Sequence, residues 1–382
     1  MLKTRKTFKY RLYTHKRNGH LHEQINVAGL IYNHCVALQR RYYRLFGGYI
    51  PKSRLQSHIA KLRKHNPLWQ KLGSQAVQQI VERVDNAYQR FFKWAKTRQG
   101  PRCSPPRFKR VRKYPSFTLK QAGWKLLEGN KIKIGSVVYR FVKSRELEGR
   151  IKTVTVKRNT LGKLYVCFSL IQQQPQIYEA ATGKIGGFDF GLKTFLVDQD
   201  GNEYLSPQFL KAELAHLKQA SRKLSSKRKG SNNRHKARLN LARKHEKVSN
   251  KRRDQHFKLS HRLLDQFDTL VFEDLNVRAM QRLWGRKVGD LGFADFLSIL
   301  EYLSTKRGKR VLKLDRFEPT TQVCSACGQR QKMPLKDRIY RCGDCGVELD
   351  RDHNAARNIF RVGASTLGLE GVRLPPLGAT PA

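Results

Sequence analysis

The chain has 382 residues, and its 39% of hydrophobic residues is typical of a folded protein with at least one sizeable core. The 78 Lys and Arg residues outnumber the 29 Asp and Glu residues, and the formal net charge of +49 indicates a polyanionic partner such as nucleic acid. No apolar stretch of membrane-spanning length and no secretory signal stand out, and the seven cysteines are odd in number, so we expect a soluble protein of the reducing cytoplasm with no membrane partner.

The first part of the chain alternates between strand and helix patterns. Apolar and basic side chains alternate over residues 7–13, "TFKYRLY", as in a half-exposed strand. Apolar stripes at helical spacing follow at about 28–45, 53–64 and 74–97, which predicts a bundle inserted after the first strand. Strand patterns return over residues 116–171, so we expect a small β-barrel or sheet that closes on the first strand.

A basic loop, "KTRQGPRCSPPRFKRVRKYPS", separates the helices from these later strands. Its four prolines forbid a continuous helix, and its Lys and Arg residues alternate with Phe108 and Tyr114. Basic side chains with this aromatic spacing are typical of contacts to a phosphate backbone. The predicted phosphate contacts are Arg107, Lys109, Arg110 and Arg112.

A polar linker, "QQQPQIYEAATGK", precedes a second unit that begins near residue 184. The next elements are two strands, a turn and a third strand, and then a long and very basic helical hairpin. The patterns that follow predict a buried strand in "DTLVFEDLNV", a helix at 293–306, a strand in "RVLKLDRF", a cysteine module at about 320–348 and a helix from about 352. The last residues have little periodicity and read as a mobile tail.

Two Cys-x-x-Cys pairs form the cysteine module. The first pair is Cys324 and Cys327, and fourteen residues separate it from Cys342 and Cys345. This spacing is that of a tetrahedral zinc ribbon, in which each pair sits on a tight turn. Because four thiolates leave no open position for substrate, we expect one structural Zn²⁺ and no catalysis at this metal.

Carboxylates occupy positions where an isolated charge is costly to bury. Asp189 lies in the apolar strand "IGGFDFG", and Glu273 ends the core strand "TLVFEDL". Asp350 and Asp352 stand where a helix begins. If these acids bind no metal, Asp352 could cap that helix and Asp189 could face water from an edge strand. Taken together, acids on two strands and a helix start match a ribonuclease-H-type arrangement that holds two Mg²⁺ or Mn²⁺ ions at a phosphodiester.

Four phrases, "GFDFGLKTF", "VFEDLNV", "CSACG…CGDCG" and "DRDHNAARN", resemble in this order the TnpB proteins of bacterial insertion sequences. The segments "TFKYRLYTHKRN", "DNAYQRFFKW" and "PRFKR" extend the resemblance over nearly the whole chain. It implies an RNA-guided, magnesium-dependent DNA endonuclease related to the type V CRISPR effectors, with Asp189, Glu273 and Asp352 as catalytic acids and magnesium ligands. Asp352 is preferred to Asp350 because it directly precedes the x-Asn-Ala-Ala run.

The same resemblance implies the domain organisation. The expected fold is α/β with a β-barrel and a helical bundle, in which a RuvC nuclease domain carries an inserted zinc ribbon. The boundaries implied are a wedge barrel at 1–19 and 104–175, a helical recognition insertion at 20–103, a RuvC domain at 184–319 and 348–362, a zinc-ribbon target-nucleic-acid-binding insertion at 320–347 and a mobile tail at 363–382.

The implied partners are a guide RNA from the end of the transposable element and a double-stranded target DNA, bound by a monomer with one RNA. The expected setting is the bacterial or archaeal cytoplasm, at the nucleoid. A short target-adjacent DNA motif would meet Ser74, Gln75, Gln78 and Thr118, since Gln can bond a base edge bidentately. Each of these positions could equally be an ordinary solvated one.

Two other functions remain open at this point. An unguided nuclease or transposase on the same scaffold would use the same carboxylates. A noncatalytic basic RNA-binding protein with a structural zinc ribbon belongs to a different class and would leave three buried acids without a purpose.

Overall fold

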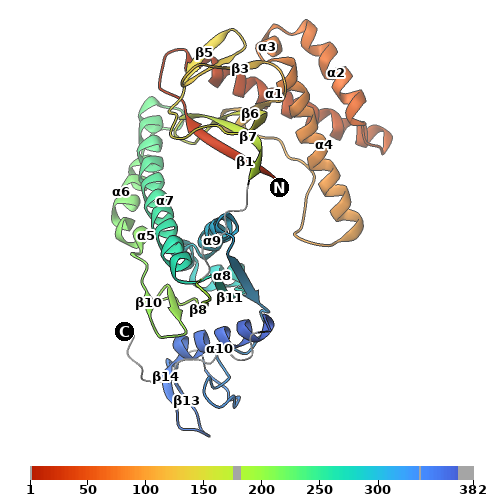
Figure 1. The fold of residues 1–382 in the computed structure, drawn as a ribbon. Helices are drawn as coiled ribbons and strands as arrows, with labels where there is room; N and C mark the ends of the chain where they lie inside the picture. The colour runs from red at the N-terminus through yellow and green to blue at the C-terminus, as the bar shows by residue number, and fades with distance from the viewer. Residues whose placement is uncertain (1, 175–181, 335–336, 369–382) are drawn as a thin grey trace. The chain divides into compact units, whose positions relative to one another are not determined.

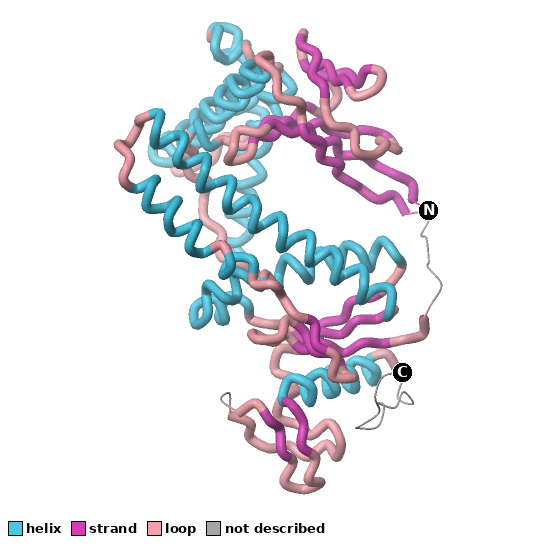
Figure 2. The backbone as a smooth tube through the Cα atoms, turned by 90° about the vertical axis from the view of Figure 1, so that its left-hand side faces the viewer, coloured by secondary structure: helices cyan, strands magenta, loops and turns pink. Residues whose placement is uncertain are grey.

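The computed structural model describes residues 2–174, 182–334 and 337–368, and the chain divides into two compact units, Met1–Pro175 and Gln176–Ala382. Figures 1 and 2 show the two units, which we call the N-terminal and C-terminal units. Most of the predicted polar linker and most of the predicted tail lie outside the described residues. Within the described part of the chain, no helix is both long and apolar enough to cross a membrane.

The N-terminal unit is built on a four-stranded antiparallel sheet, and strand β1 (Leu2–Arg11) lies at one edge of it. The predicted alternation of this strand is confirmed, since Tyr10 is 1% exposed while Lys9 and Arg11 are exposed. In spatial order the other strands are β7 (Leu164–Gln174), β6 (Arg150–Arg158) and β2 (Ser116–Leu119).

A second sheet of this unit is a three-stranded meander. It consists of β3 (Trp124–Leu127), β4 (Lys131–Ile134) and β5 (Val137–Arg140). A single bridge between Leu12 and Phe141 joins it to the end of β1. The described strands therefore form two linked sheets, and the predicted closure into one barrel is not confirmed.

The helices of the N-terminal unit lie between β1 and β2 in the chain, as the sequence predicts. They are α1 (Asn18–Phe46), α2 (Lys52–His65), α3 (Pro67–Gln70) and α4 (Ser74–Thr97), with a short 3-10 helix at Val111–Lys113. Their apolar faces and the four-stranded sheet share one buried cluster. Helix α1 begins about ten residues before its predicted start, and its added first turns bury Leu21 and Ile25 among polar neighbours.

The C-terminal unit contains a five-stranded sheet in the order β10-β9-β8-β11-β12. Strands β8 (Ile185–Asp189), β9 (Leu196–Asp198) and β10 (Glu203–Tyr204) form an antiparallel meander. Strands β11 (Thr269–Glu273) and β12 (Arg310–Leu314) run parallel to β8. Three antiparallel strands followed by two parallel ones are the order expected for the ribonuclease-H-type sheet.

Helices cover both faces of this sheet (Figure 1). One face packs on α7 (Asn232–Gln266), α8 (Val277–Leu291) and α9 (Phe293–Arg307) through Phe188, Leu270 and Phe272. The other face packs on α10 (Arg351–Thr366) through Ile185 and Val271. The predicted basic hairpin comprises α6 (Leu214–Ser225) and α7, and the short α5 (Phe209–Ala212) precedes it.

Glycines set how closely α10 approaches the sheet. A Cβ atom on Gly187 of β8 would lie 2.4 Å from the backbone nitrogen of Phe360, and one on Gly363 would lie 2.5 Å from Val271 Cγ2. These contacts leave no room for a side chain, so backbone packs almost directly on the sheet. These two contacts fix the distance between α10 and the sheet, and they thereby fix the position of the first residues of the helix.

The cysteine module lies between β12 and α10 in the chain. It contains β13 (Ile339–Arg341) and β14 (Glu348–Asp350), which pair with each other. The ribbon therefore continues to Asp350, beyond the boundary predicted at 347. The predicted tail boundary at 363 is also wrong, because α10 continues to Thr366 as it covers Val271 and Leu314.

Candidate active site and metal centre

The ends of two parallel strands bring two carboxylates to one edge of the sheet. Phe188 of β8 pairs with Phe272 of β11, so Asp189 and Glu273 stand at the same level. Since side chains alternate along a strand, both residues point to the face that α10 covers, opposite to Phe188 and Phe272. Asp189 is 7% exposed and Glu273 is partly buried.

The start of α10 supplies the third carboxylate. Asp350 caps this helix, and its side chain accepts hydrogen bonds from the backbone nitrogens of Asp352 (2.8 Å) and His353 (3.3 Å). The capping role considered for Asp352 thus falls to Asp350, and the Asp352 side chain is left for other partners. Arg351 contacts one of its oxygens at 3.3 Å, and Arg338 lies 3.9 Å from the other.

Helix α10 runs antiparallel to β8, which carries Asp352 toward Asp189. Phe360 lies against Gly187, and the Asp352 carboxylate lies against Gly191, where a Cβ would be 3.2 Å from Oδ2. The eight residues of helix between these contacts rise about 12 Å, and the four residues of extended chain span about 13 Å. These two lengths are nearly equal, so the start of α10 lies level with the residues that follow β8. All three predicted acids therefore lie at the same end of the sheet.

The three carboxylates repel one another. Burial raises the pKa of Asp189 well above its usual range, and the charges of Asp352 and Glu273 raise it further. Burial also raises the pKa of Glu273, although the Thr320 hydroxyl that hydrogen-bonds to it acts in the opposite direction. Because these carboxylates are buried and repel one another, a bound cation would stabilise their charged forms.

This repulsion makes a prediction about stability. Because folding raises the pKa of Asp189, the folded state binds the extra proton, and stability declines as pH rises from the unfolded pKa through the folded one. At neutral pH with no Mg²⁺ or Mn²⁺ added, Asp189→Asn is expected to raise the melting temperature, by about 2–4 °C per kcal/mol recovered. Differential scanning fluorimetry checks this against Asp254→Asn, an exposed acid of α7 that should change nothing. A lower melting temperature for Asp189→Asn would contradict the electrostatic account.

The donor set fits a hard divalent cation. All three side chains offer carboxylate oxygens, which Mg²⁺ and Mn²⁺ prefer.

The segment that enters the ribbon is attached to the active-site strand. Thr320 is 2% exposed, and its hydroxyl donates a hydrogen bond to the Glu273 carboxylate. Asn358 of α10 donates to the backbone oxygens of Thr320 (2.8 Å) and Val323 (2.7 Å). One helical turn earlier, Asn354 donates to Val323 O at 2.8 Å and accepts from Ser325 N at 2.9 Å. We call these contacts the asparagine clamp.

The four cysteines come together as predicted. Their Sγ atoms all lie within 4.8 Å of one another, and the Cys324–Cys345 and Cys327–Cys342 pairs are 3.6 Å apart. A tetrahedral Zn²⁺ with ~2.3 Å bonds requires sulfur atoms about 3.8 Å apart, so the separation fits. Gly328 and Gly346 follow the second cysteine of each pair at φ of +83° and +70°, a conformation that glycine adopts readily.

The predicted DNA-motif residues differ in exposure. Ser74 and Gln78 are exposed in the first turns of α4, and Gln75 is half-buried there. Thr118 is 8% exposed, and its hydroxyl lies 2.7 Å from Arg83 Nη2 and 2.8 Å from Thr155 Oγ1. Thr118 is thus engaged within the N-terminal unit, which departs from the exposed position that base recognition requires.

The basic loop is held against α1. Lys109 exchanges two backbone hydrogen bonds of 2.8 Å with the Asn33 side chain, and its ammonium lies 4.7 Å from the Tyr32 ring centroid. Burial lowers the pKa of Lys109, and the charge of Arg83 adds to this effect. Arg107, Arg110 and Arg112 are exposed. Lys109 is exposed as well, so all four predicted phosphate contacts lie at the surface of an anchored loop.

The sequence interpretation missed the residues that position the site. Thr320, Asn354 and Asn358 carry no charge and match no catalytic pattern, so nothing singles out Thr320. The pair of asparagines four residues apart, on a helix face that is otherwise apolar, is a signal that could have been read as a polar contact to a neighbouring segment.

A ribonuclease-H-type sheet with three carboxylates at one end, and a four-cysteine ribbon before its last helix, is the arrangement expected of a nuclease of the RuvC type. Comparison with known families agrees. A family model for IS605 OrfB, described as "Probable transposase", matches residues 168–283, and a "Cas12f1-like, TNB domain" model matches residues 293–359.

Known proteins of similar sequence place the chain in a family. A "Putative RNA-guided DNA endonuclease" of Streptomyces pristinaespiralis is 31% identical over 98% of this chain and 93% of its own length. InsQ of Escherichia coli K12, with the same description, is 28% identical over 88% of this chain and 87% of its own. The chain belongs to the TnpB family of RNA-guided DNA endonucleases.

A solved structure extends the comparison to the fold. The protein in "Cryo-EM structure of the Cas12f1-sgRNA-target DNA complex" matches with a TM-score of 0.56 at 15% identity, over 94% of this chain and 98% of that one. This likeness confirms the expected relation in fold to the RuvC-containing CRISPR effectors.

Proposed function

We propose that this protein is an RNA-guided endonuclease that cleaves double-stranded DNA beside a short target-adjacent motif and that a transposable element encodes it. The observation that carries this proposal is the meeting of Asp189, Glu273 and Asp352 at one end of the sheet, in a chain that shares 31% of its residues with a relative of that description. The net charge of +49 supports two polyanionic partners.

In the proposed reaction a phosphodiester is hydrolysed at these three carboxylates. Asp189, Glu273 and Asp352 would together hold two Mg²⁺ or Mn²⁺ ions through their carboxylate oxygens. When bound, the ions activate a water molecule and stabilise the charge that develops on the leaving oxygen. The protein positions its carboxylates through the strand ends, the Asp350 cap and the Thr320 hydroxyl.

The remaining parts of the chain would bind nucleic acid. Base pairing with the guide RNA carries the sequence of the target, and the protein reads the heteroduplex by its shape and backbone. Exposed basic residues such as Lys236, Arg243 and Lys251 of α7, together with Arg107, Arg110 and Arg112, would contact phosphates. Ser74, Gln75 and Gln78 would meet the target-adjacent motif in a monomer that binds one RNA.

The ribbon would hold one structural Zn²⁺ through Cys324, Cys327, Cys342 and Cys345. Since the asparagine clamp joins the ribbon to the helix that carries Asp352, we propose that the folded ribbon also maintains the geometry of the active site. This explains why the metal knuckle stands directly before the last carboxylate in the sequence.

The experiment that tests the proposed function is to express the protein with the DNA that flanks its gene and to sequence the RNA that co-purifies. We expect one dominant structured RNA with a defined end that runs into flanking sequence. Heterogeneous fragments of abundant cellular RNA would instead favour the unguided nuclease or the noncatalytic RNA-binding protein, and Asp189→Ala separates those two by its effect on DNA cleavage.

The bond from Thr320 to Glu273 makes a separate prediction. Thr320→Val keeps the shape and removes the donor, so the pKa of Glu273 should rise and the carboxylate should bind metal less well. We expect cleavage to need about tenfold more Mg²⁺ and its acid limb to move to higher pH, given the ~1.5–3 kcal/mol typical of hydrogen bonds to charged groups. Titration of Mg²⁺ at several pH values measures both.

Thr320→Ser restores a hydroxyl and should recover most of the lost metal affinity. Thr305→Val is the matched control, since Thr305 is exposed on α9 and donates only to the backbone of its own helix. Equal magnesium requirements for the wild type and Thr320→Val would show that this hydroxyl does not position Glu273.

A further inference from the structure

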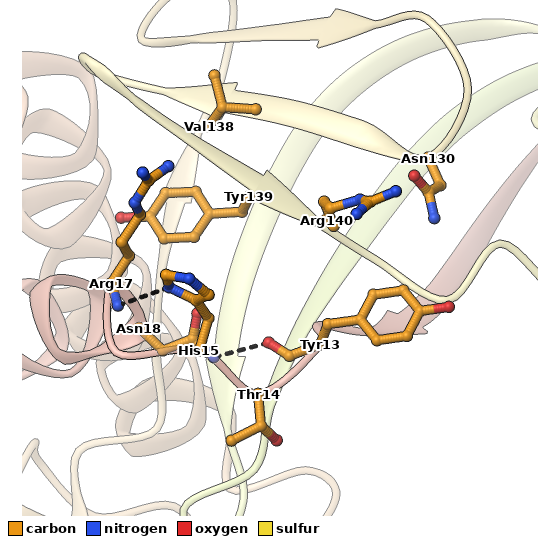
Figure 3. A pocket seen from close by; sticks show the side chains of 9 residues that line it. All are labelled: Tyr13, Thr14, His15, Arg17, Asn18, Asn130, Val138, Tyr139 and Arg140. Carbon is orange, nitrogen blue, oxygen red and sulfur yellow. Dashed lines mark hydrogen bonds between the residues drawn. The ribbon is translucent and has the colours of Figure 1, made fainter.

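The N-terminal unit contains a pocket that none of the proposed roles uses. Its volume is about 520 Å³, and Figure 3 shows the nine residues that line it. One wall is the turn between β1 and α1, which includes Tyr13, His15 and Arg17, and the other is the meander, which includes Asn130 and Arg140. We call it the Tyr13 pocket. Sites for one small organic group have volumes of about 300–1,000 Å³, so the size suits a single nucleotide.

The backbone around the Tyr13 pocket is held in place. Tyr13 N donates to Arg140 O at 3.0 Å, which ties the turn to the meander. Asn18 Nδ2 donates to Tyr13 O at 2.9 Å, and Arg17 N donates to His15 Nδ1 at 3.1 Å (dashed in Figure 3). Tyr139 is buried in the meander, and its hydroxyl oxygen lies 3.3 Å from His20 Nδ1 of α1. The pocket is therefore formed before any ligand arrives.

Side chains at the rim are left without partners. Tyr13 is 48% exposed, and its hydroxyl and the side chains of Arg17, Arg140 and Asn130 make no hydrogen bond or ion pair among the described residues. None of the lining residues is acidic. In Figure 3, the Tyr13 ring, Asn130 and the Arg140 guanidinium extend toward one end of the pocket, and Arg17 lies at the other.

The chemistry of these groups matches the parts of one nucleotide. An exposed aromatic ring stacks a base, a guanidinium binds a phosphate, and an amide offers both a donor and an acceptor to a base edge or a ribose hydroxyl. Proteins that recognise RNA use this combination on unpaired bases, because bases within an A-form helix cannot be reached. A purely electrostatic contact to duplex would require neither the ring nor a concave site.

We propose that the Tyr13 pocket binds one unpaired nucleotide of the guide RNA, with its base on the Tyr13 ring and its phosphate at Arg140 or Arg17. This inference rests on the proposed function, since it names a site for the RNA partner. By fixing one nucleotide, the pocket sets the register in which the folded RNA lies on the N-terminal unit.

The test uses the full-length protein and a labelled transcript of the RNA recovered from the wild-type complex. Tyr13→Leu should weaken RNA binding about tenfold, equal to ~1.4 kcal/mol, while Tyr13→Trp should stay within about twofold because it retains a stacking surface. Arg140→Gln should reduce the slope of log affinity against log salt by ~0.7, the value for one phosphate of a single strand, whereas Tyr13→Leu should leave that slope unchanged. Tyr43→Leu is the matched control, an exposed tyrosine of α1 that does not line the pocket.

Ultraviolet crosslinking with peptide mass spectrometry adds a direct measurement. We expect an RNA nucleotide on the peptide that contains Tyr13, at one position of the RNA. Tyr13→Leu binding as tightly as the wild type, or a crosslink from this peptide to target DNA alone, would overturn the assignment while leaving the guided reaction intact. A wild-type protein that selects no discrete RNA would overturn both the guided function and the pocket's role in it.

Discussion

Asp189→Ala is expected to abolish DNA cleavage and to leave guide RNA binding unchanged. Both other acids act on the pKa of Asp189, and its substitution would remove one of the three carboxylates proposed to hold the metal ions. Loss of the several kcal/mol that such ions contribute to the transition state corresponds to a rate at least about 10³-fold lower. The RNA-binding surfaces proposed here do not include Asp189, which is 7% exposed at the end of β8.

The measurement pairs a cleavage assay on a plasmid that carries the guide-matched target with an RNA-binding titration of the same preparation. Glu273→Ala and Asp352→Ala should give the same pattern. Asp254→Ala, an exposed acid of α7, is the control and should cleave normally. Cleavage at wild-type rates by Asp189→Ala would exclude the proposed active site, and loss of RNA binding together with cleavage would indicate a folding defect instead.

The second large effect concerns the ribbon. The double variant Cys324→Ser, Cys327→Ser should lose its bound zinc, since two of four thiolates are removed, and should also lose most of its cleavage. The expected loss of cleavage follows from the asparagine clamp, because Val323 and Ser325 of the ribbon are bonded to Asn354 and Thr320 is bonded to both Asn358 and Glu273. If the ribbon unfolds, these hydrogen bonds are lost, and Glu273 and the start of α10 lose the support that positions their carboxylates.

Metal content by mass spectrometry and the cleavage assay measure the two consequences separately. Zinc content should fall from one ion per chain to none. The control is Cys103→Ser, which changes a cysteine of the basic loop in the N-terminal unit and should retain both zinc and activity. Unchanged zinc would refute the ligand assignment. Loss of zinc with normal cleavage would show that the ribbon does not support the active site.

Much of the local structure could be predicted from the sequence. Helix α4 has the predicted bounds of Ser74–Thr97, since its apolar stripe is uninterrupted, and α9 and the hairpin of β8 and β9 lie where their patterns indicate. Each Cys-x-x-Cys turn has a fixed local geometry, so the four cysteines come together once the two turns are in contact. In each case a short stretch of chain carries the information.

Predictions that depended on contacts between distant segments were less successful. The strands of the N-terminal unit have the expected patterns, but alternation does not say whether a sheet closes, and the described strands form two sheets. The resemblance implies that Thr118 meets the DNA motif, and the structure adds that Arg83 and Thr155, which are distant in the sequence, hydrogen-bond with its hydroxyl. Whether a polar side chain is free depends on residues that no local pattern contains.

The sequence by itself identified the residues that we propose carry the chemistry: four thiolates at ribbon spacing and carboxylates at the ends of two apolar strands and the start of a helix. Only the tertiary structure decided how they are arranged. A hydrogen bond shows that Asp350 and not Asp352 caps α10, the approach of α10 follows from Gly187 and Gly363, and the support of Glu273 by Thr320 joins residues 47 positions apart. The physical reason is that a carboxylate's role depends on its burial, its neighbours and its hydrogen bonds, and packing alone brings these together.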